Sequence, residues 1–307
     1  MAHDEQAGWL LEGDPAIRWQ VLRDLLHAKP EVVTAERERV AAEGWGAALL
    51  AEQDDEGTWG GALYSPKWTS TTYTLLLLRR LGLERGHSRA LAGCRVLWDR
   101  AAVWDGGLTL AKSIREPETC ITAMLVLLAE DFGLDEPRVA PTVAWLLGQQ
   151  LDDGGWNCES VRSGSTRGSF HTTISVLEAL DAHARGSGEV PVADALAAGR
   201  EYLLERALFR SRRTGEVVDP AYLRFPFPPQ WHYDVLRGLE HLVAAGAPPD
   251  ARAEEAVELV RAARGADRRW RRHQPWPGRY WFPLEPAGPS RWATLRALRV
   301  LSWWDGT

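Results

Sequence analysis

Several short polar segments that precede apolar stretches carry side chains able to exchange protons. Glu116 and Glu118 stand two residues apart just before a long apolar run. His171, His232 and Asp234 occupy comparable positions further along the chain. Imidazoles titrate near neutral pH and can hydrogen-bond or shuttle protons, whereas glutamates at a helix start also stabilise the helix dipole. A capping role and a catalytic role are therefore both open for the two glutamates.

Aromatic and basic side chains accompany these groups in the same segments. Aromatic faces suit a hydrophobic ligand and stabilise a carbocation, although such rings can also simply plug the centre of a barrel. Guanidinium groups can bind phosphate oxygens without a metal ion. The expected substrate-binding residues are Trp19, Trp68, Tyr73, Phe170, Trp231, Tyr233 and Trp292, together with Arg18, Lys67 and Arg291.

These segments recur along the chain with a period. Six polar-aromatic clusters are centred on residues 19, 68, 119, 171, 232 and 292, with steps of 49, 51, 52, 61 and 60 residues. Such a period leaves room for two helices per repeat and is typical of stacked helical hairpins. If the repeats close into a ring, all six clusters meet at one mouth.

The six clusters can meet at one mouth only if each of them begins a helix that lines the ring. The stretches Thr71 to Leu81 and Thr119 to Phe132 are apolar on most sides, which predicts buried inner helices that end at Gly82 and Gly133. No segment alternates with period two, so a sheet is not expected. Amphipathic outer helices are predicted near residues 36 to 52, 88 to 100, 138 to 150, 193 to 208 and 251 to 264.

The composition is that of a globular protein. The chain has 307 residues, 45% of them hydrophobic, and a net charge of -6 with both signs interspersed, so nucleic acid is not an expected partner. Three cysteines without close spacing favour a reducing compartment. No leader is recognisable at the polar N-terminus, and the longest apolar run is too short to span a bilayer. We therefore expect a cytoplasmic protein.

Two loops carry a resemblance to a known family. Gln53 to Gly60 (QDDEGTWG) and Gln149 to Trp156 (QQLDDGGW) resemble the glutamine-tryptophan repeats of squalene and oxidosqualene cyclases, which are related to repeats of the protein prenyltransferase beta subunit. Weaker copies are Trp104 to Gly107 and Asp267 to Trp270. In that family the glutamine and tryptophan tie adjacent helices together, so Trp59 and Trp156 are expected to be structural.

The resemblance implies an all-α fold, an α/α toroid of six hairpins with inner and outer layers of helices. It covers most of the chain, and we expect residues 1–307 to form a single toroid domain. Full-length triterpene cyclases carry two such domains. The motifs are specific for the superfamily and do not identify an activity.

The resemblance also implies a role for the third cluster. Glu116-Pro117-Glu118-Thr119-Cys120 lies where the related cyclases carry an acidic motif whose aspartic acid protonates an alkene or epoxide. Glu116 and Glu118 match its first two acids, and Thr119 replaces the third. Such an acid must be kept neutral by desolvation and by a neighbouring carboxylate. On this interpretation Glu118 donates the proton and Glu116 tunes it.

A second implication concerns zinc. His171 resembles a histidine that helps to bind zinc in protein prenyltransferases, and Cys158, His232 and Asp234 could converge on it. The aspartate and cysteine pair of that family is not evident, so no metal and no cofactor is expected. Zinc-assisted prenyl transfer is the alternative.

The segment Arg224 to Trp231 (RFPFPPQW) predicts a rigid aromatic loop before the fifth inner helix, either a lid over the mouth or packing at its rim. No glycine-rich phosphate loop, serine elbow or aspartate-rich diphosphate motif is present.

The preferred hypothesis is acid-initiated cyclisation or isomerisation of an isoprenoid-like substrate in an aromatic-lined cavity. His171 or His232 would take the terminating proton. A non-catalytic lipid-binding or scaffold toroid is the alternative from another class. A peripheral membrane contact and the oligomeric state are left open.

Overall fold

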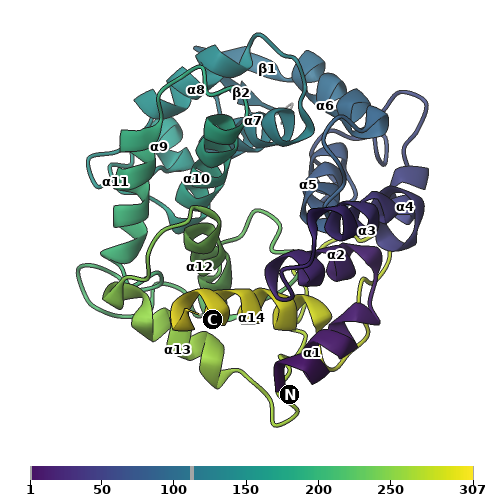
Figure 1. Cartoon of the computed structure of the whole chain (residues 1–307). Helices are drawn as coiled ribbons and strands as arrows, with labels where there is room; N and C mark the ends of the chain where they lie inside the picture. Colours follow the sequence, from purple (N-terminus) through teal and green to yellow (C-terminus); the bar gives the residue numbers. More distant parts are fainter. Residues whose placement is uncertain (1, 111–113, 307) are drawn as a thin grey trace.

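The chain is mostly helical, as predicted. The computed structural model describes residues 2–110 and 114–306. Figure 1 shows the helices arranged around a ring, with one layer facing its centre and another outside it. Within the described ranges, the helices that line the centre are α2 (Pro15–Asp24), α5 (Thr71–Leu81), α7 (Thr119–Phe132), α10 (Phe170–Arg185), α12 (Val235–Ala244) and α14 (Arg291–Asp305).

The outer layer is made of shorter amphipathic helices. Its members are α3 (Pro30–Ala42), α4 (Gly44–Ala51), α6 (Ser88–Arg100), α8 (Val139–Gly148), α11 (Ala193–Leu204) and α13 (Glu254–Ala262). The remaining elements are α1 (Ala2–Leu11), α9 (Cys158–Ser163), η1 (Pro220–Leu223), η2 (Ala251–Ala253), β1 (Ala102–Trp104) and β2 (Gly107–Thr109).

The two inner helices predicted from apolar runs have the predicted bounds. Helices α5 and α7 are buried along most of their length and end at Gly82 and Gly133, whose φ angles are 97° and 74°. Glycine adopts this left-handed conformation without the strain that a Cβ atom would cause. No helix in the described part of the chain is long and apolar enough to cross a membrane.

The tryptophan loops join neighbouring helices, which confirms their structural role. The Trp59 indole N–H donates to the Leu49 carbonyl (2.7 Å), and the Trp156 indole donates to Leu146 (2.8 Å). The amides of Gln53 and Gln150 each bridge two backbone carbonyls, one in their own loop and one near the start of the next outer helix. Each buried indole therefore fixes one helical hairpin to the next.

A threonine in each of several inner helices completes this unit. Its hydroxyl accepts a hydrogen bond from a backbone N–H of the preceding loop, at donor to acceptor distances of 2.9–3.0 Å. The bond holds the loop against the first turns of the inner helix, so the repeat seen in the sequence is also a repeat of contacts. The threonines are Thr71, Thr122, Thr173 and Thr294.

The first outer segment differs from the prediction of one helix over residues 36 to 52. It forms two helices, α3 and α4, which are separated at Glu43. Gly44 has a φ of 61°, and a Cβ atom there would lie 1.9 Å from Oδ2 of Asp14. That carboxylate accepts the backbone N–H of Trp45 (2.8 Å), so close approach of Asp14 breaks the helix.

A short hairpin also departs from the expectation of no sheet. Strands β1 and β2 pair antiparallel around Asp105 and Gly106, both of which have positive φ. Trp104 precedes the turn of this weaker loop copy and is 41% exposed, whereas the position held by Trp59 and Trp156 in the other loops is held here by the buried Leu108. Two strands of three residues were too short to show a period in the sequence.

The ring closes between its first and last inner helices. Arg299 of α14 donates to Asp24 (2.6 Å) and to Gln20 (2.9 Å), both on α2. Figure 1 shows the two chain ends in the same part of the ring. All six inner helices therefore surround one space.

Candidate functional site

Two cavities in the described part of the chain bear on function. The larger, which we call the central cavity, has a volume of about 790 Å³ and is lined by all the inner helices. The smaller, the aromatic pocket, has a volume of about 360 Å³ and lies between α5 and the segments 227–230 and 272–285. Phe227 lines both, so its ring is a shared wall.

The aromatic pocket brings together two of the predicted substrate-binding residues. Trp68 and Tyr73 line it and pack edge to face, with ring centroids 4.7 Å apart. Segment 227–230 of the predicted aromatic loop forms another wall, and most of the remaining wall comes from segment 272–285, for which no role was predicted. Proline and aromatic residues dominate that segment, and this composition was the feature of the sequence that could have indicated a pocket wall. The residues are Pro275, Tyr280, Trp281, Phe282 and Pro283.

Aromatic side chains fill the N-terminal mouth, by which we mean the ends of the inner helices near residues 68, 171 and 231–234. The His232 ring stacks between Trp231 (3.8 Å between centroids) and Trp276 (3.5 Å). His171 packs edge to face on Trp231 at 5.0 Å. The protein's own rings therefore occupy much of the mouth.

Two other predicted binding residues belong to this packing. Phe170 contacts Tyr202, Tyr222 and Tyr233 with ring centroids 4.9–5.5 Å apart. The Tyr233 hydroxyl donates to the Leu208 carbonyl (2.6 Å) and is fully buried. Both rings contribute to the wall, and neither lines the two cavities described above.

Trp19 and Trp292 line the central cavity instead of the aromatic pocket. Trp19 lies in the middle of α2, and its indole N–H donates to the Leu81 carbonyl at the C-terminal end of α5 (2.8 Å). Trp292 stacks on Phe227 with centroids 3.9 Å apart. The aromatic loop of residues 224–231 thus packs over the start of α14, as the rim alternative predicts.

Glu118 is the half-buried acid at the start of α7. Its side chain is 14% exposed, and its carboxylate accepts the Thr109 hydroxyl (3.1 Å) and lies 3.5 Å from Nη2 of Arg162. Burial raises the pKa of Glu118, while Thr109 and Arg162 oppose that rise. A carboxyl in this setting can hold a proton at higher pH than a free glutamate.

Glu116 lies outside this buried setting. Its side chain is 49% exposed, and its nearest ion-pair partner is Nε of Arg162 at 3.9 Å. Glu116 and Glu118 therefore share one arginine. Neither residue lines the central cavity or the aromatic pocket.

His171 and His232 lie close together, with ring centroids 5.9 Å apart. Nδ1 of His171 accepts the backbone N–H of Tyr233 (2.8 Å). Burial, together with nearby positive charge, lowers the pKa of His171 to about 4 and that of His232 to about 3. Both imidazoles are therefore neutral at pH 7. Because Nδ1 of His171 already accepts the Tyr233 N–H, the ring with an unengaged nitrogen is that of His232, whose Nδ1 has no hydrogen-bond partner among the described residues.

This neutrality has a measurable consequence. We expect the His171 and His232 ring resonances, assigned by His171→Gln and His232→Gln, to show no titration between pH 7 and pH 5.5 in proton-carbon NMR spectra. Unfolded histidine titrates near pH 6.5, so between pH 6.5 and pH 4 the unfolded state binds more protons and stability falls as pH falls. The slope is at most about 1.4 kcal/mol per pH unit for each ring. A titration midpoint near 6.5 in the folded protein would contradict this.

Asp234 is a helix cap. Its Oδ1 accepts the backbone N–H of Arg237 (2.8 Å) and lies 3.7 Å from Nη2 of Arg296. Burial raises its pKa to about 6, although Arg296 acts in the opposite direction. Asp234 therefore caps the N-terminus of α12 and lies beside the positive charge of Arg296.

The alternative zinc site does not assemble. Within residues 2–110 and 114–306, no group of three or more histidine, cysteine, aspartate or glutamate side chains could hold a metal ion. The Cys158 sulfur accepts the backbone N–H of Cys120 (3.2 Å) and the Thr172 hydroxyl (3.5 Å), while Asp234 caps α12. The set Cys158, His171, His232 and Asp234 was therefore wrong as a metal site, because its members serve separate local hydrogen bonds.

The three predicted cations have different positions. Arg18 donates to Glu36 (2.6 Å) and to the Gly13 carbonyl (2.8 Å). Arg291 donates to the Trp9 carbonyl (3.1 Å) and lies over the Trp9 ring. Lys67 alone faces the mouth, 5.2 Å from the Trp231 ring centroid and 5.7 Å from that of Trp68.

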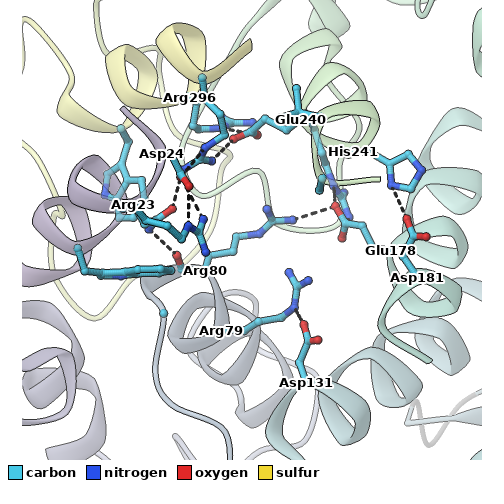
Figure 2. A pocket seen from close by; sticks show the side chains of 18 of the residues that line it. Arg23, Asp24, Arg79, Arg80, Asp131, Glu178, Asp181, Glu240, His241 and Arg296 are labelled. Atoms are coloured by element: carbon cyan, nitrogen blue, oxygen red, sulfur yellow. Dashed lines mark hydrogen bonds and ion pairs between the residues drawn. The ribbon is translucent and has the colours of Figure 1, made fainter. Parts of the chain in front are cut away.

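The sequence analysis missed the charged lining of the central cavity. Figure 2 shows the charged groups of several of these side chains directed at one another across it. The feature of the sequence that could have indicated this lining is the presence of charged residues inside otherwise apolar inner helices. Among the described residues, eight arginines and five carboxylates line the cavity: Arg23, Arg37, Arg79, Arg80, Arg185, Arg237, Arg296, Arg299, Asp24, Asp131, Glu178, Asp181 and Glu240.

Comparison with known proteins gives similarity at the level of fold. No family model and no curated protein matches the chain. A protein from Actinoplanes of known structure is similar over 99% of this chain and 98% of its own, with 19% identity and a TM-score of 0.50. At that identity the two chains share a fold, and nothing about function follows.

Terpene cyclases are also among the structural neighbours. The type II terpene cyclase MstE from Scytonema is similar over 87% of this chain and 96% of its own chain, with 14% identity and a TM-score of 0.35. A variant of that enzyme in complex with its product, merosterolic acid A, gives 13% identity and a TM-score of 0.34. These scores are too low to assign an activity or a site residue to this chain.

Proposed function

We propose that the protein is a terpenoid cyclase-like enzyme built on a six-hairpin α/α toroid. It binds an isoprenoid-like hydrocarbon in the aromatic pocket and starts cyclisation or isomerisation by proton transfer from Glu118. The observations that carry the proposal are an aromatic pocket walled by Trp68 and Tyr73, and the half-buried carboxyl of Glu118 at the start of the inner helix α7.

The proton balance of the proposed reaction closes within the mouth. The protonated Glu118 carboxyl gives its proton to an alkene carbon, which leaves a carbocation. Trp68 and Tyr73 present aromatic faces and edges to that cation. Loss of a proton to Nδ1 of the neutral His232 restores an alkene; the imidazolium then releases that proton to solvent, and solvent reprotonates Glu118. Glu116 tunes Glu118 through their shared contact with Arg162.

The test is Glu118→Gln, which keeps the shape of the side chain and removes its acid. We expect the variant to bind its isoprenoid within about twofold of the wild type and to lose product formation by about 100-fold or more. Substrate would be sought in a panel of isoprenoid alkenes and epoxides, with products measured by mass spectrometry and binding by fluorescence. Unchanged turnover in Glu118→Gln would overturn the mechanism.

Glu159→Gln is the matched control. Glu159 is 50% exposed and also pairs with Arg162, at 3.2 Å, so its removal alters the same arginine without removing the proposed acid. We expect its turnover to equal that of the wild type. A comparable loss in both variants would show that Arg162, and not the proton of Glu118, is responsible.

A second candidate is a non-catalytic toroid that binds an apolar ligand. Two observations favour it: the stack of Trp231, His232 and Trp276 fills the mouth, and Glu118 lines neither cavity. Isoprenoid binding by the wild type without any product would support this candidate over the enzyme. In both cases we propose a cytoplasmic protein whose partner is a hydrophobic small molecule.

A further inference from the structure

The central cavity carries more positive than negative charge. Among the described residues that line it, arginines exceed carboxylates by three, eight against five. Taking charge out of water is costly unless it is paired with opposite charge and hydrogen-bonded. Two of these arginines, Arg23 and Arg185, have side chains that are 51% and 56% exposed and are therefore hydrated, which leaves six arginines against five carboxylates. The remaining positive charge favours water or an anion in the cavity.

Several carboxylates of the cavity are shared between arginines. Glu178 binds Arg237 through two bonds of 2.8 Å, and Arg80 reaches the same carboxylate at 3.4 Å (Figure 2). Glu240 likewise binds both Arg296 (2.7 Å) and Arg299 (3.2 Å). Each of these carboxylates supplies one negative charge to two positive groups.

Arg296 is the arginine with the largest unmet hydrogen-bonding capacity. It is 2% exposed, and only its Nε is engaged, by Glu240. Its two terminal nitrogens, Nη1 and Nη2, are buried and have no hydrogen-bond partner among the described residues; Nη2 lies 3.7 Å from Oδ1 of Asp234, beyond hydrogen-bond distance. An unmet pair of donors on one guanidinium is the group that binds two oxygens of one anion.

Arg80 supplies a second cation without a full partner. Its contact with Glu178 is long (3.4 Å), and burial together with the like charges of Arg237, Arg79 and Arg296 lowers its pKa to about 10, although Glu178 opposes them. Arg80 and Arg296 come from α5 and α14, and both line the cavity. Their charges therefore act on the same space.

We propose that the central cavity binds a small organic molecule carrying a phosphate or diphosphate group, held by Arg80 and Arg296. Phosphate oxygens match the guanidinium fork, and their negative charge offsets the unmatched positive charge of the cavity. Apolar walls adjoin the arginines, among them Phe132, Phe227, Val243 and Trp303. The ligand therefore has an apolar part beside its phosphate. This site is separate from Glu118 and the aromatic pocket, and does not depend on the proposed cyclase activity.

Binding of pyrophosphate, inorganic phosphate and octyl phosphate by the full chain tests the proposal, in calorimetry with EDTA present so that no divalent cation bridges the anion. We expect wild-type protein to bind pyrophosphate with a dissociation constant below about 1 mM. Arg80→Gln and Arg296→Gln should each weaken it by about tenfold or more, because each removes a charged donor. Arg80→Gln keeps the bonds between Arg237 and Glu178, so we expect this variant to fold. It therefore tests the proposal even if Arg296→Gln does not fold.

Arg252→Gln is the control for net charge. Arg252 is an exposed arginine that pairs with Glu201 and Asp250 outside the ring, so its loss should leave pyrophosphate binding unchanged. Equal weakening in Arg252→Gln and Arg80→Gln would show diffuse attraction and overturn the site. So would undiminished binding by Arg80→Gln, or no binding by the wild type below about 1 mM.

Octyl phosphate tests the apolar part of the ligand. We expect it to bind at least about tenfold more tightly than inorganic phosphate, because its chain buries against the apolar walls. Equal affinity for the two would overturn the apolar part of the proposal. Since the readout is binding, failure here leaves the Glu118 turnover experiment unaffected, and the reverse also holds.

Discussion

Replacing Trp156 by alanine should lower the free energy of unfolding by about 3–5 kcal/mol, the usual range for loss of a buried tryptophan. The Trp156 side chain is fully buried, and its indole N–H is bonded to the Leu146 carbonyl in α8. The substitution would leave a cavity between α8, α10 and α11, and an unpaired carbonyl. Chemical denaturation followed by circular dichroism measures the change.

Trp104→Ala is the control for loss of an exposed tryptophan, because the residue that corresponds to Trp156 in the weaker loop copy is Leu108, whose backbone N–H donates to Thr122 as that of Trp156 donates to Thr173. The Trp104 side chain is 41% exposed in strand β1, so we expect a change within about 0.5 kcal/mol. Equal destabilisation by the two substitutions would mean that the buried Trp156 side chain contributes no more to stability than an exposed tryptophan. That result would contradict the different packing seen here.

Replacing Glu178 by glutamine should lower the free energy of unfolding by about 3 kcal/mol or more at pH 7, since it leaves a buried arginine without its counter-charge. Arg237 is 4% exposed and makes both of its carboxylate bonds to Glu178. Glutamine keeps the size of the side chain and accepts only one of those bonds. Denaturant unfolding at fixed pH gives the difference.

The same substitution should change how stability depends on pH. Burial raises the pKa of Glu178, but Arg237 and Arg80 together lower it far below the ordinary value of 4.5. A lowered pKa means that the stabilisation is present above pH 4.5 and is lost as pH falls toward the folded pKa. Between pH 5 and pH 3 the wild type should therefore lose stability more steeply than Glu178→Gln.

Glu201→Gln is the control for both measurements. Glu201 is 49% exposed and pairs with Arg252 at 2.5 Å, so its loss should cost no more than about 1 kcal/mol. If Glu178→Gln proved equally mild, the ion pairs of the central cavity would be contributing no more than surface pairs.

The helical fold could be predicted from the sequence because apolar runs and the residues that end helices are local features. The apolar runs that became α5 and α7 ended at glycines, and both bounds were correct. The break between α3 and α4 was missed, because it depends on Asp14, whose carboxylate approaches Gly44 from a distant part of the chain. The motif around Trp104 did not reveal that this side chain is exposed, because exposure also depends on contacts with other parts of the chain.

The candidate site was predicted less completely, because cavities form between helices. Trp68 and Tyr73 were identified at the mouth and do line the aromatic pocket. Trp19 was expected beside them, but α2 extends beyond the mouth and places that ring in the central cavity. Glu178 and Arg296 were overlooked, since a charged residue within an apolar run appears anomalous until its partner on a neighbouring helix is known.

Phe227 gives the two cavities a common boundary. Its ring lines the aromatic pocket on one side and the charged central cavity on the other, and it stacks on Trp292. Any rotation of that ring which enlarges one space reduces the other. Two occupants would therefore alter each other's affinity by the same factor, as thermodynamic reciprocity requires. One phenylalanine thus joins two chemically different cavities into a single linked equilibrium.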